Sequence, residues 1–308
     1  MSSGKRLSFL LMGVLVGSLA LLAPKIHVDG QQKGSSAARA ADSQEAAVVR
    51  LSADVARSRV DPAFERAALQ NVALQSEMNW LFGGRTQRGW YLYVPLIASM
   101  IAADEEPSSG RFAVRLSRWQ ADNGLRATGV LDTATWSRMV EVFQSARIKD
   151  RTSRAADKLV TAPIADFYDQ SRPEELRQVE PRTYQAYKRM IRAAAADPSL
   201  DLATTRTGEL ASDEKFFKII SAFRSPEYQD QLRHQSPHSG RAGLAINSPH
   251  FTGRVLDLYV GGEPVSTKDE NRAIQIKTPA YRWLVKNAAR FGFRPYFYEP
   301  WHWEHVSD

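Results

Sequence analysis

Apolar and β-branched residues gather in three short stretches of the C-terminal half and predict β-strands there. These stretches are residues 216–223, residues 254–260 and the aromatic residues 296–298, which precede a proline. In 254–260, an alternation of period two places Asp257 on one face of the predicted strand, between Val255 and Tyr259. The strand therefore carries one acidic side chain among apolar ones.

Other stretches show the spacing of amphipathic helices. Three such helices are expected, within residues 45–80 before Gly83-Gly84, from Tyr184 to Ala194, and from Thr278-Pro279 to Gly292.

Residues 90–145 predict a small module of helices. Phe112, Leu116 and Trp119 share one helical face, and Asp132 has the position of a helix N-cap. Apolar residues recur at helical spacing after that cap, at Trp136, Val140 and Phe143. The pattern by itself gives this module no function.

Composition limits the chemistry that the chain can perform. The 308 residues are enough for two domains with separate cores, and the absence of cysteine excludes disulfides and thiolate metal sites. Any metal site must therefore use histidine and carboxylate ligands. The net charge of +7 favours polyanionic partners, but no nucleic-acid-binding motif is present, so we expect no nucleic acid partner.

The acidic residue of the strand has candidate partners for a metal site. His250, Asp257 and His302 are possible ligands of one zinc ion, and Glu299 is a possible general base beside them. An aspartate within an apolar strand is costly to bury unless a cation compensates its charge. Glu304 would share a strand face with His302, as a partner of that ligand or a rival base. The spacing alone is not specific, and ordinary packed or surface residues remain the alternative.

Three sequence motifs occur around these candidate residues: Ser248-x-His250-x-x-Gly253-x-x-x-Asp257, Glu299-Pro300-Trp301-His302, and Ser221-Ala222-Phe223-Arg224-Ser225 with Gln229 beyond it. Together they resemble the VanY-like zinc D,D-carboxypeptidases and their L,D-carboxypeptidase and D,D-dipeptidase relatives. The resemblance covers roughly residues 180–305 and departs from the family pattern at Val255 and His305.

The resemblance implies a function for each of these residues. It favours Zn²⁺ bound by His250, Asp257 and His302, with Glu299 as the base. It gives Arg224 the task of holding the terminal carboxylate of the substrate. Ser248 is expected either to hydrogen-bond the substrate backbone or to orient a ligand, and Gln229 is expected at the substrate.

Part of the helical module resembles peptidoglycan-binding domains. The similar residues are Phe112-Ala113-Val114, Trp119-Gln120, Gly124-Leu125, Thr128 to Asp132 and Thr135-Trp136. This resemblance implies a cell-wall anchor, and a structural spacer is the alternative.

The N-terminus has the composition of an export signal. Lys5 and Arg6 precede an apolar run over residues 7–23, which predicts either a cleaved signal peptide or a retained membrane tether. Both place the protein outside the cytoplasm, in the periplasm or cell wall.

These observations predict an α+β fold, with a small antiparallel-sheet zinc peptidase domain and flanking helices, preceded by a small three-helix domain. The expected segments are a signal peptide or anchor (1–23), a flexible tether (24–44), a helical spacer (45–84), a peptidoglycan-binding-like domain (85–145), a linker (146–180) and a zinc carboxypeptidase domain (181–308). Residues 236–238 repeat the Ser-Pro-His sequence and are expected in a loop at the rim of the site.

The expected activity is a zinc metallopeptidase that trims the terminal D-Ala from peptidoglycan stem peptides. The alternatives are an L,D-carboxypeptidase, a cross-link endopeptidase of the same family, and a non-catalytic wall-binding protein. The sequence predicts no oligomeric state.

Overall fold

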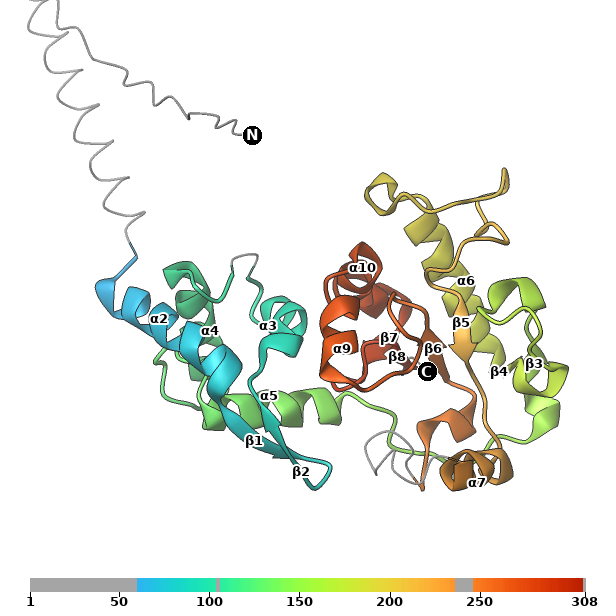
Figure 1. Ribbon diagram of the computed structural model, residues 1–308, viewed down its shortest axis with the longest axis horizontal. Helices are drawn as coiled ribbons and strands as arrows, with labels where there is room; N and C mark the ends of the chain where they lie inside the picture. Colours follow the sequence, from blue (N-terminus) through green and yellow to red (C-terminus); the bar gives the residue numbers. More distant parts are fainter. Residues whose placement is uncertain (1–59, 104–105, 236–245, 307–308) are drawn as a thin grey trace, which may run out of the picture. The chain divides into compact units, whose positions relative to one another are not determined.

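The computed structural model describes residues 60–103, 106–235 and 246–306 (Figure 1). The predicted signal, the tether, the first part of the helical spacer and the expected loop at 236–238 lie outside the described residues. Within the part of the chain that is described, no helix is long and apolar enough to cross a membrane. Residues from Arg59 onward form one compact unit.

A helix and a hairpin open the described chain. Helix α2 (Pro62–Glu77) begins at Asp61, whose side chain accepts a hydrogen bond from Ala63 N at 2.7 Å. Strands β1 (Asn79–Phe82) and β2 (Arg85–Arg88) then pair antiparallel. The helix predicted within residues 45–80 is confirmed over Pro62–Glu77, but Gly83-Gly84 do not end it: both glycines have positive φ angles (60° and 77°) and form the hairpin turn.

Three helices follow the 3₁₀ turn η1 (Tyr91–Tyr93). They are α3 (Val94–Met100), α4 (Gly110–Asp122) and α5 (Thr133–Ser145). The predicted N-cap at Asp132 is confirmed, since its carboxylate accepts a hydrogen bond from Thr135 N at 2.8 Å. The assignment of this region as a separate peptidoglycan-binding domain stays a prediction.

Buried amide side chains fix the turn between α4 and α5. Asn71 of α2 donates to Gly129 O at 2.9 Å and accepts from Leu131 N at 2.8 Å. Gln120 of α4 accepts from Gly129 N and donates to Val130 O. Gly129 has φ of 71°, and a Cβ there would lie 2.7 Å from a carbonyl oxygen of α4, so this close approach requires glycine.

The segment predicted as a linker, residues 146–180, is folded onto the core. It contains the short antiparallel pair β3 (Val160–Thr161) and β4 (Gln178–Val179). It also contains three 3₁₀ turns, η2 (Ala156–Lys158), η3 (Ile164–Asp166) and η4 (Glu174–Leu176). Phe167 and Val179 are fully buried.

A four-stranded antiparallel sheet forms the centre of the C-terminal half (Figure 1). Its strands, in spatial order, are β5 (Ile219–Ser221), β6 (Val255–Leu258), β8 (His302–His305) and β7 (Phe293–Pro295). The strands predicted at 216–223 and 254–260 are confirmed in shorter form. The one at 296–298 is wrong: these residues form a turn, and Glu299 N donates to Tyr296 O at 3.0 Å within it.

Helices flank this sheet, as the α+β prediction requires. The helices and 3₁₀ turns of this half, in chain order, are α6 (Pro181–Ala195), η5 (Pro198–Leu200), α7 (Pro226–Gln235), η6 (Pro249–Thr252), α9 (Asp269–Gln275), α10 (Pro279–Asn287) and η7 (Ala288–Phe291). Thr278 caps α10, as predicted, by accepting a hydrogen bond from Tyr281 N at 3.2 Å. Helix α10 packs against α3, and α9 packs against η1.

One core joins the helical region to the sheet region. Trp80, Tyr93 and Trp136 contact one another and Phe297, with ring centroids 4.9 to 6.4 Å apart. Arg272 of α9, which is buried, donates to Tyr93 Oη and to a backbone carbonyl of the turn before β8, each at 3.1 Å. The turn that leads into β8 is therefore packed against residues from the N-terminal helices.

Candidate metal centre

The local sequence around His250 makes a tight turn into β6. Ser248 caps η6, with its hydroxyl accepting from His250 N at 3.4 Å, and Pro249 occupies the first turn. Gly253 ends η6 with φ of 67°, where a Cβ would lie 2.7 Å from the Leu159 side chain. This turn directs the chain into β6, which begins five residues after His250.

Strand pairing then brings Asp257 to its partners. In the ladder, Asp257 of β6 lies opposite His302 of β8 on one side and opposite Ser221 of β5 on the other. Directly opposite residues in an antiparallel pair have neighbouring side chains. Strand β6 thus places the Asp257 carboxylate between residues of β5 and β8.

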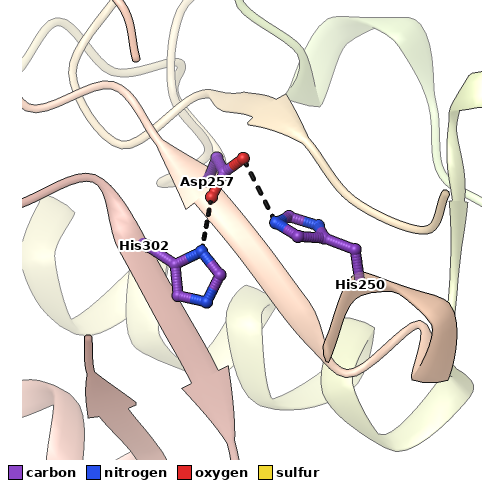
Figure 2. A group of neighbouring side chains, drawn as sticks. All are labelled: His250, Asp257 and His302. Atoms are coloured by element: carbon purple, nitrogen blue, oxygen red, sulfur yellow. Dashed lines mark hydrogen bonds and ion pairs between the residues drawn. The ribbon is translucent and has the colours of Figure 1, made fainter. Parts of the chain in front are cut away.

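His250, Asp257 and His302 form a buried cluster (Figure 2). His250 Nε2 lies 3.3 Å from Asp257 Oδ2, and His302 Nδ1 lies 3.1 Å from Asp257 Oδ1. One ligand atom from each residue lies within 4.8 Å of the others. Figure 2 shows the imidazole rings on either side of the carboxylate. The donors are thus close enough to share one metal ion.

The outer nitrogens of both rings are held by acceptors. His250 Nδ1 donates to Ala222 O at 2.6 Å, because a carbonyl oxygen can only accept. His302 Nε2 lies 3.2 Å from Glu304 Oε1. With its proton on the outer nitrogen, the neutral His250 ring directs a lone pair toward Asp257, and the His302 ring would do the same once a bound cation displaced its inner proton. The donor set therefore fits a zinc ion.

The pKa values of the cluster reflect its burial and charge. Burial lowers the pKa of His250 to about 4, with the charge of Arg224 adding to the effect, so the ring is neutral at pH 7 as a metal ligand must be. Burial opposes the charge of Asp257, but His250, His302 and Arg224 together hold its pKa well below the usual range. Burial also opposes the charge of His302, yet hydrogen bonds to Asp257 and Glu304 raise its pKa to about 9.

Glu299 lies beside the cluster in the turn before β8. Its Oε2 is 3.7 Å from His302 Nδ1, and the residue is buried. Burial, reinforced by the charge of Asp257, raises the pKa of Glu299 to about 7. A carboxyl group with that pKa can both accept and return a proton near neutral pH.

Arg224 points at the cluster from the end of β5. Its Nη2 lies 2.6 Å from Asp257 Oδ2, and its Nε donates to Ser221 Oγ at 2.9 Å. Gln229 is buried and accepts from Arg224 Nη1 at 3.5 Å. The structure therefore brings Arg224 and Gln229 together at the cluster. The hydroxyl of Ser248 instead accepts a hydrogen bond from the backbone of η6, at His250 N. The substrate-binding roles of these three residues stay predictions.

Glu304 lies on the outer side of His302. It is fully buried, and its oxygens also accept from Arg147 Nε at 2.7 Å and from Ile148 N at 2.8 Å. Burial opposes its charge, but the hydrogen bond from His302 and the charge of Arg147 lower its pKa to about 2. Glu304 is thus a fully engaged, ionised partner of His302 and is poorly suited to be a base.

Sequence reasoning missed Arg147 and Ile148. They follow α5 in a charged stretch that carries no motif, and they lie 157 and 156 residues from their common partner. The one signal for this network was the position of Glu304 two residues after His302, which would place both side chains on one face if the segment were a strand, as it is in β8.

Comparison with known proteins agrees with the geometry. No curated protein matches the chain. Residues 176–308, which include the whole His250, Asp257 and His302 cluster, match the model of VanY, the D-alanyl-D-alanine carboxypeptidase family, and this match supports a peptidase that acts on the cell wall.

Proposed function

We propose that this protein is a zinc-dependent D,D-carboxypeptidase that removes the C-terminal D-Ala from peptidoglycan stem peptides. The observation that carries the proposal is the buried cluster of His250, Asp257 and His302 inside the segment that matches the VanY family. Glu299, with a pKa of about 7, lies beside that cluster.

His250, Asp257 and His302 would hold the ion. Two imidazoles and one carboxylate are a common ligand set of catalytic zinc, which keeps a further position open. When bound, zinc supplies a Lewis acid that polarises the scissile carbonyl and lowers the pKa of the attacking water.

Glu299 performs the proton transfers in this proposal. Its carboxylate takes a proton from the attacking water and returns it to the amine of the leaving D-Ala. Burial supports this role, because it brings the pKa of Glu299 close to the pH at which both transfers must occur.

Arg224 supplies recognition of the chain end. A guanidinium offers a planar pair of N–H donors that matches a carboxylate, and Arg224 carries this group at the edge of the cluster. Gln229 and Ser221 hold the guanidinium from two other directions. The free C-terminal carboxylate of a stem peptide is the group that this arrangement would bind.

The N-terminal part of the chain would bring the enzyme to peptidoglycan. We assign residues 85–145 to peptidoglycan binding and residues 1–23 to export or membrane tethering, so that the enzyme acts in the periplasm or cell wall. The net charge of +7 supports attraction to an anionic wall.

Mass spectrometry of defined stem peptides tests the proposal. The purified, zinc-loaded protein is incubated with a pentapeptide and a tetrapeptide stem, with and without a chelator. We expect the pentapeptide to lose one D-Ala, and the chelator to abolish this loss. Trimming of the tetrapeptide alone would replace the proposal with an L,D-carboxypeptidase. Cleavage of cross-linked muropeptides alone would indicate an endopeptidase, and no cleavage of any substrate would indicate a wall-binding protein.

A further inference from the structure

The segment after α5 contacts both parts of the chain that carry the histidines. Here, residues 147–154 are called the bridging segment. Arg147 and Ile148 hydrogen-bond to Glu304 in β8, two residues from His302. Arg151 Nη1 donates to Asn247 O at 2.9 Å, and Arg154 N donates to Phe251 O at 2.8 Å. The bridging segment therefore touches the sequence neighbours of both histidines, and it lies outside residues 176–308, the part that matches the VanY family.

Arg147 is held in place on several sides. Its Nε and Nη2 lie 2.7 and 2.6 Å from the same Glu304 oxygen, and its Nη1 donates to Gln144 Oε1 at 3.2 Å. The guanidinium carbon lies 3.9 Å from the ring centroid of Tyr296. A side chain fixed in this way can in turn fix the carboxylate that it binds.

Glu304 transmits this constraint to the metal centre. The oxygen that Arg147 binds is also the one that lies 3.2 Å from His302 Nε2. A carboxylate at Nε2 keeps the proton on that nitrogen and leaves Nδ1, which faces Asp257, as the ligand atom. The orientation of the imidazole and its tautomer thus depend on where Glu304 is held.

We propose that Arg147 is a positioning residue of the metal centre, which acts through Glu304 on His302 and so sets the affinity for zinc. The inference rests on the proposed function, since it takes zinc as the ion at this site. Arg147 lies two positions after the last residue of α5, so the helical region contributes directly to the metal centre.

Zinc affinity of the metal-free full-length protein tests the proposal. It is measured by competition with a chromophoric chelator in Arg147→Ala, Arg147→Lys and Arg138→Ala. Removing the direct outer partner of a metal ligand, here Glu304, weakens affinity by about 10–100-fold, and Arg147→Ala, which acts through Glu304, should lose up to about 10-fold. Lysine keeps the positive charge but not the paired N–H donors of the guanidinium, so the zinc affinity of Arg147→Lys should lie between those of the unaltered protein and Arg147→Ala. Arg138 also bonds to a glutamate but is exposed, so Arg138→Ala is the matched control and should bind zinc normally.

A double-mutant cycle separates positioning from general damage. In a Glu304→Gln background, Arg147→Ala should cause little further loss of zinc affinity, because the route to His302 is already broken. Excess zinc should restore hydrolysis by Arg147→Ala with an unchanged KM for the peptide. Circular dichroism identifies folded variants, and Arg147→Lys carries the test if Arg147→Ala does not fold.

Several results would overturn the inference. Unchanged zinc affinity in both Arg147 variants contradicts it, and so does an undiminished loss in the Glu304→Gln background. Failure of the proposed function gives a different result. In that case the unaltered protein binds zinc but cleaves no stem peptide, while zinc affinity still falls from Arg138→Ala to Arg147→Lys to Arg147→Ala. An unaltered protein that binds no zinc at all contradicts both.

Discussion

Two clusters of buried polar side chains, one in the helical region and one in the sheet region, are built on opposite principles. Asn71, Gln120 and Thr135 form a neutral cluster around the turn between α4 and α5, where both amide side chains bond to backbone groups and Gln120 also donates to the Thr135 hydroxyl. The cluster around Asp257 is ionic, with Arg224 and two histidines around one carboxylate.

The difference lies in what each cluster needs to be complete. In the neutral cluster, both ends of the Asn71 and Gln120 amides have partners from the protein itself, so burial costs little. In the ionic cluster, the charge of Asp257 is balanced by Arg224 and by the inner proton of His302, whose pKa is about 9, and a bound metal ion would displace that proton. The neutral cluster therefore stabilises the fold, whereas the ionic cluster offers the charge and the donor atoms that a cation would use. Substitutions should therefore separate stability from zinc binding.

The largest effect is expected from Asp257→Asn. The substitution preserves shape but removes the negative ligand between His250 and His302, so zinc binding and hydrolysis should both be lost. Metal analysis of the purified variant and the stem-peptide assay measure the two effects. Retention of zinc at full stoichiometry would show that the carboxylate is no ligand and would remove the contrast between the clusters.

Gln120→Ala should lower the stability of the fold and leave zinc binding intact. It leaves the buried Gly129 N without an acceptor and removes one of the two donors to Val130 O, the other being Asp132 N, and this should lower the free energy of unfolding by about 1–3 kcal/mol. Zinc affinity should stay unchanged. Urea denaturation measures the first quantity, and Gln70→Ala, an exposed glutamine on α2, is the control. A loss of zinc affinity in a still folded Gln120→Ala protein would mean that the two clusters are coupled.

Arg224→Ala should have a smaller effect, confined to substrates with a free carboxylate. Losing a charge-assisted pair of hydrogen bonds should cost about 1.5–3 kcal/mol in kcat/KM for the pentapeptide. The amidated pentapeptide, which has no terminal charge, serves as the matched control substrate and should lose less. Equal losses on both substrates would assign Arg224 to the orientation of Asp257 instead of the recognition of the chain end.

The sequence was sufficient where a short segment determines its own structure. Ser248, Pro249 and Gly253 specify the turn that presents His250, and Asp132 and Thr278 specify helix starts. The aromatic residues 296–298 misled the strand prediction, because β-propensity was overridden by a turn whose residues pack into the shared core. Gly83-Gly84 have the composition of a hairpin turn, but the short strands on either side of them, Asn79–Phe82 and Arg85–Arg88, are not marked by any apolar alternation.

Contacts between distant segments could not be predicted. Arg147 reaches Glu304 across 157 residues, and nothing in its neighbourhood distinguishes it from the other arginines of the charged stretch. Such contacts are set by the packing of the helical region on the sheet region, which depends on many side chains at once. The candidate ligands could thus be named from local motifs, while the residues that contact them from distant segments could not.

Glu299→Gln tests the central claim most directly, with zinc content and pentapeptide hydrolysis measured on the same preparation. Glutamine keeps the size and the polar contacts of Glu299 but cannot accept the proton of the attacking water. We predict one zinc ion per chain, as in the unaltered protein, together with a loss of hydrolysis of about 10²–10⁴-fold, the usual contribution of a general base. Hydrolysis at the unaltered rate with zinc bound would contradict the assignment of Glu299 as the base of a zinc peptidase.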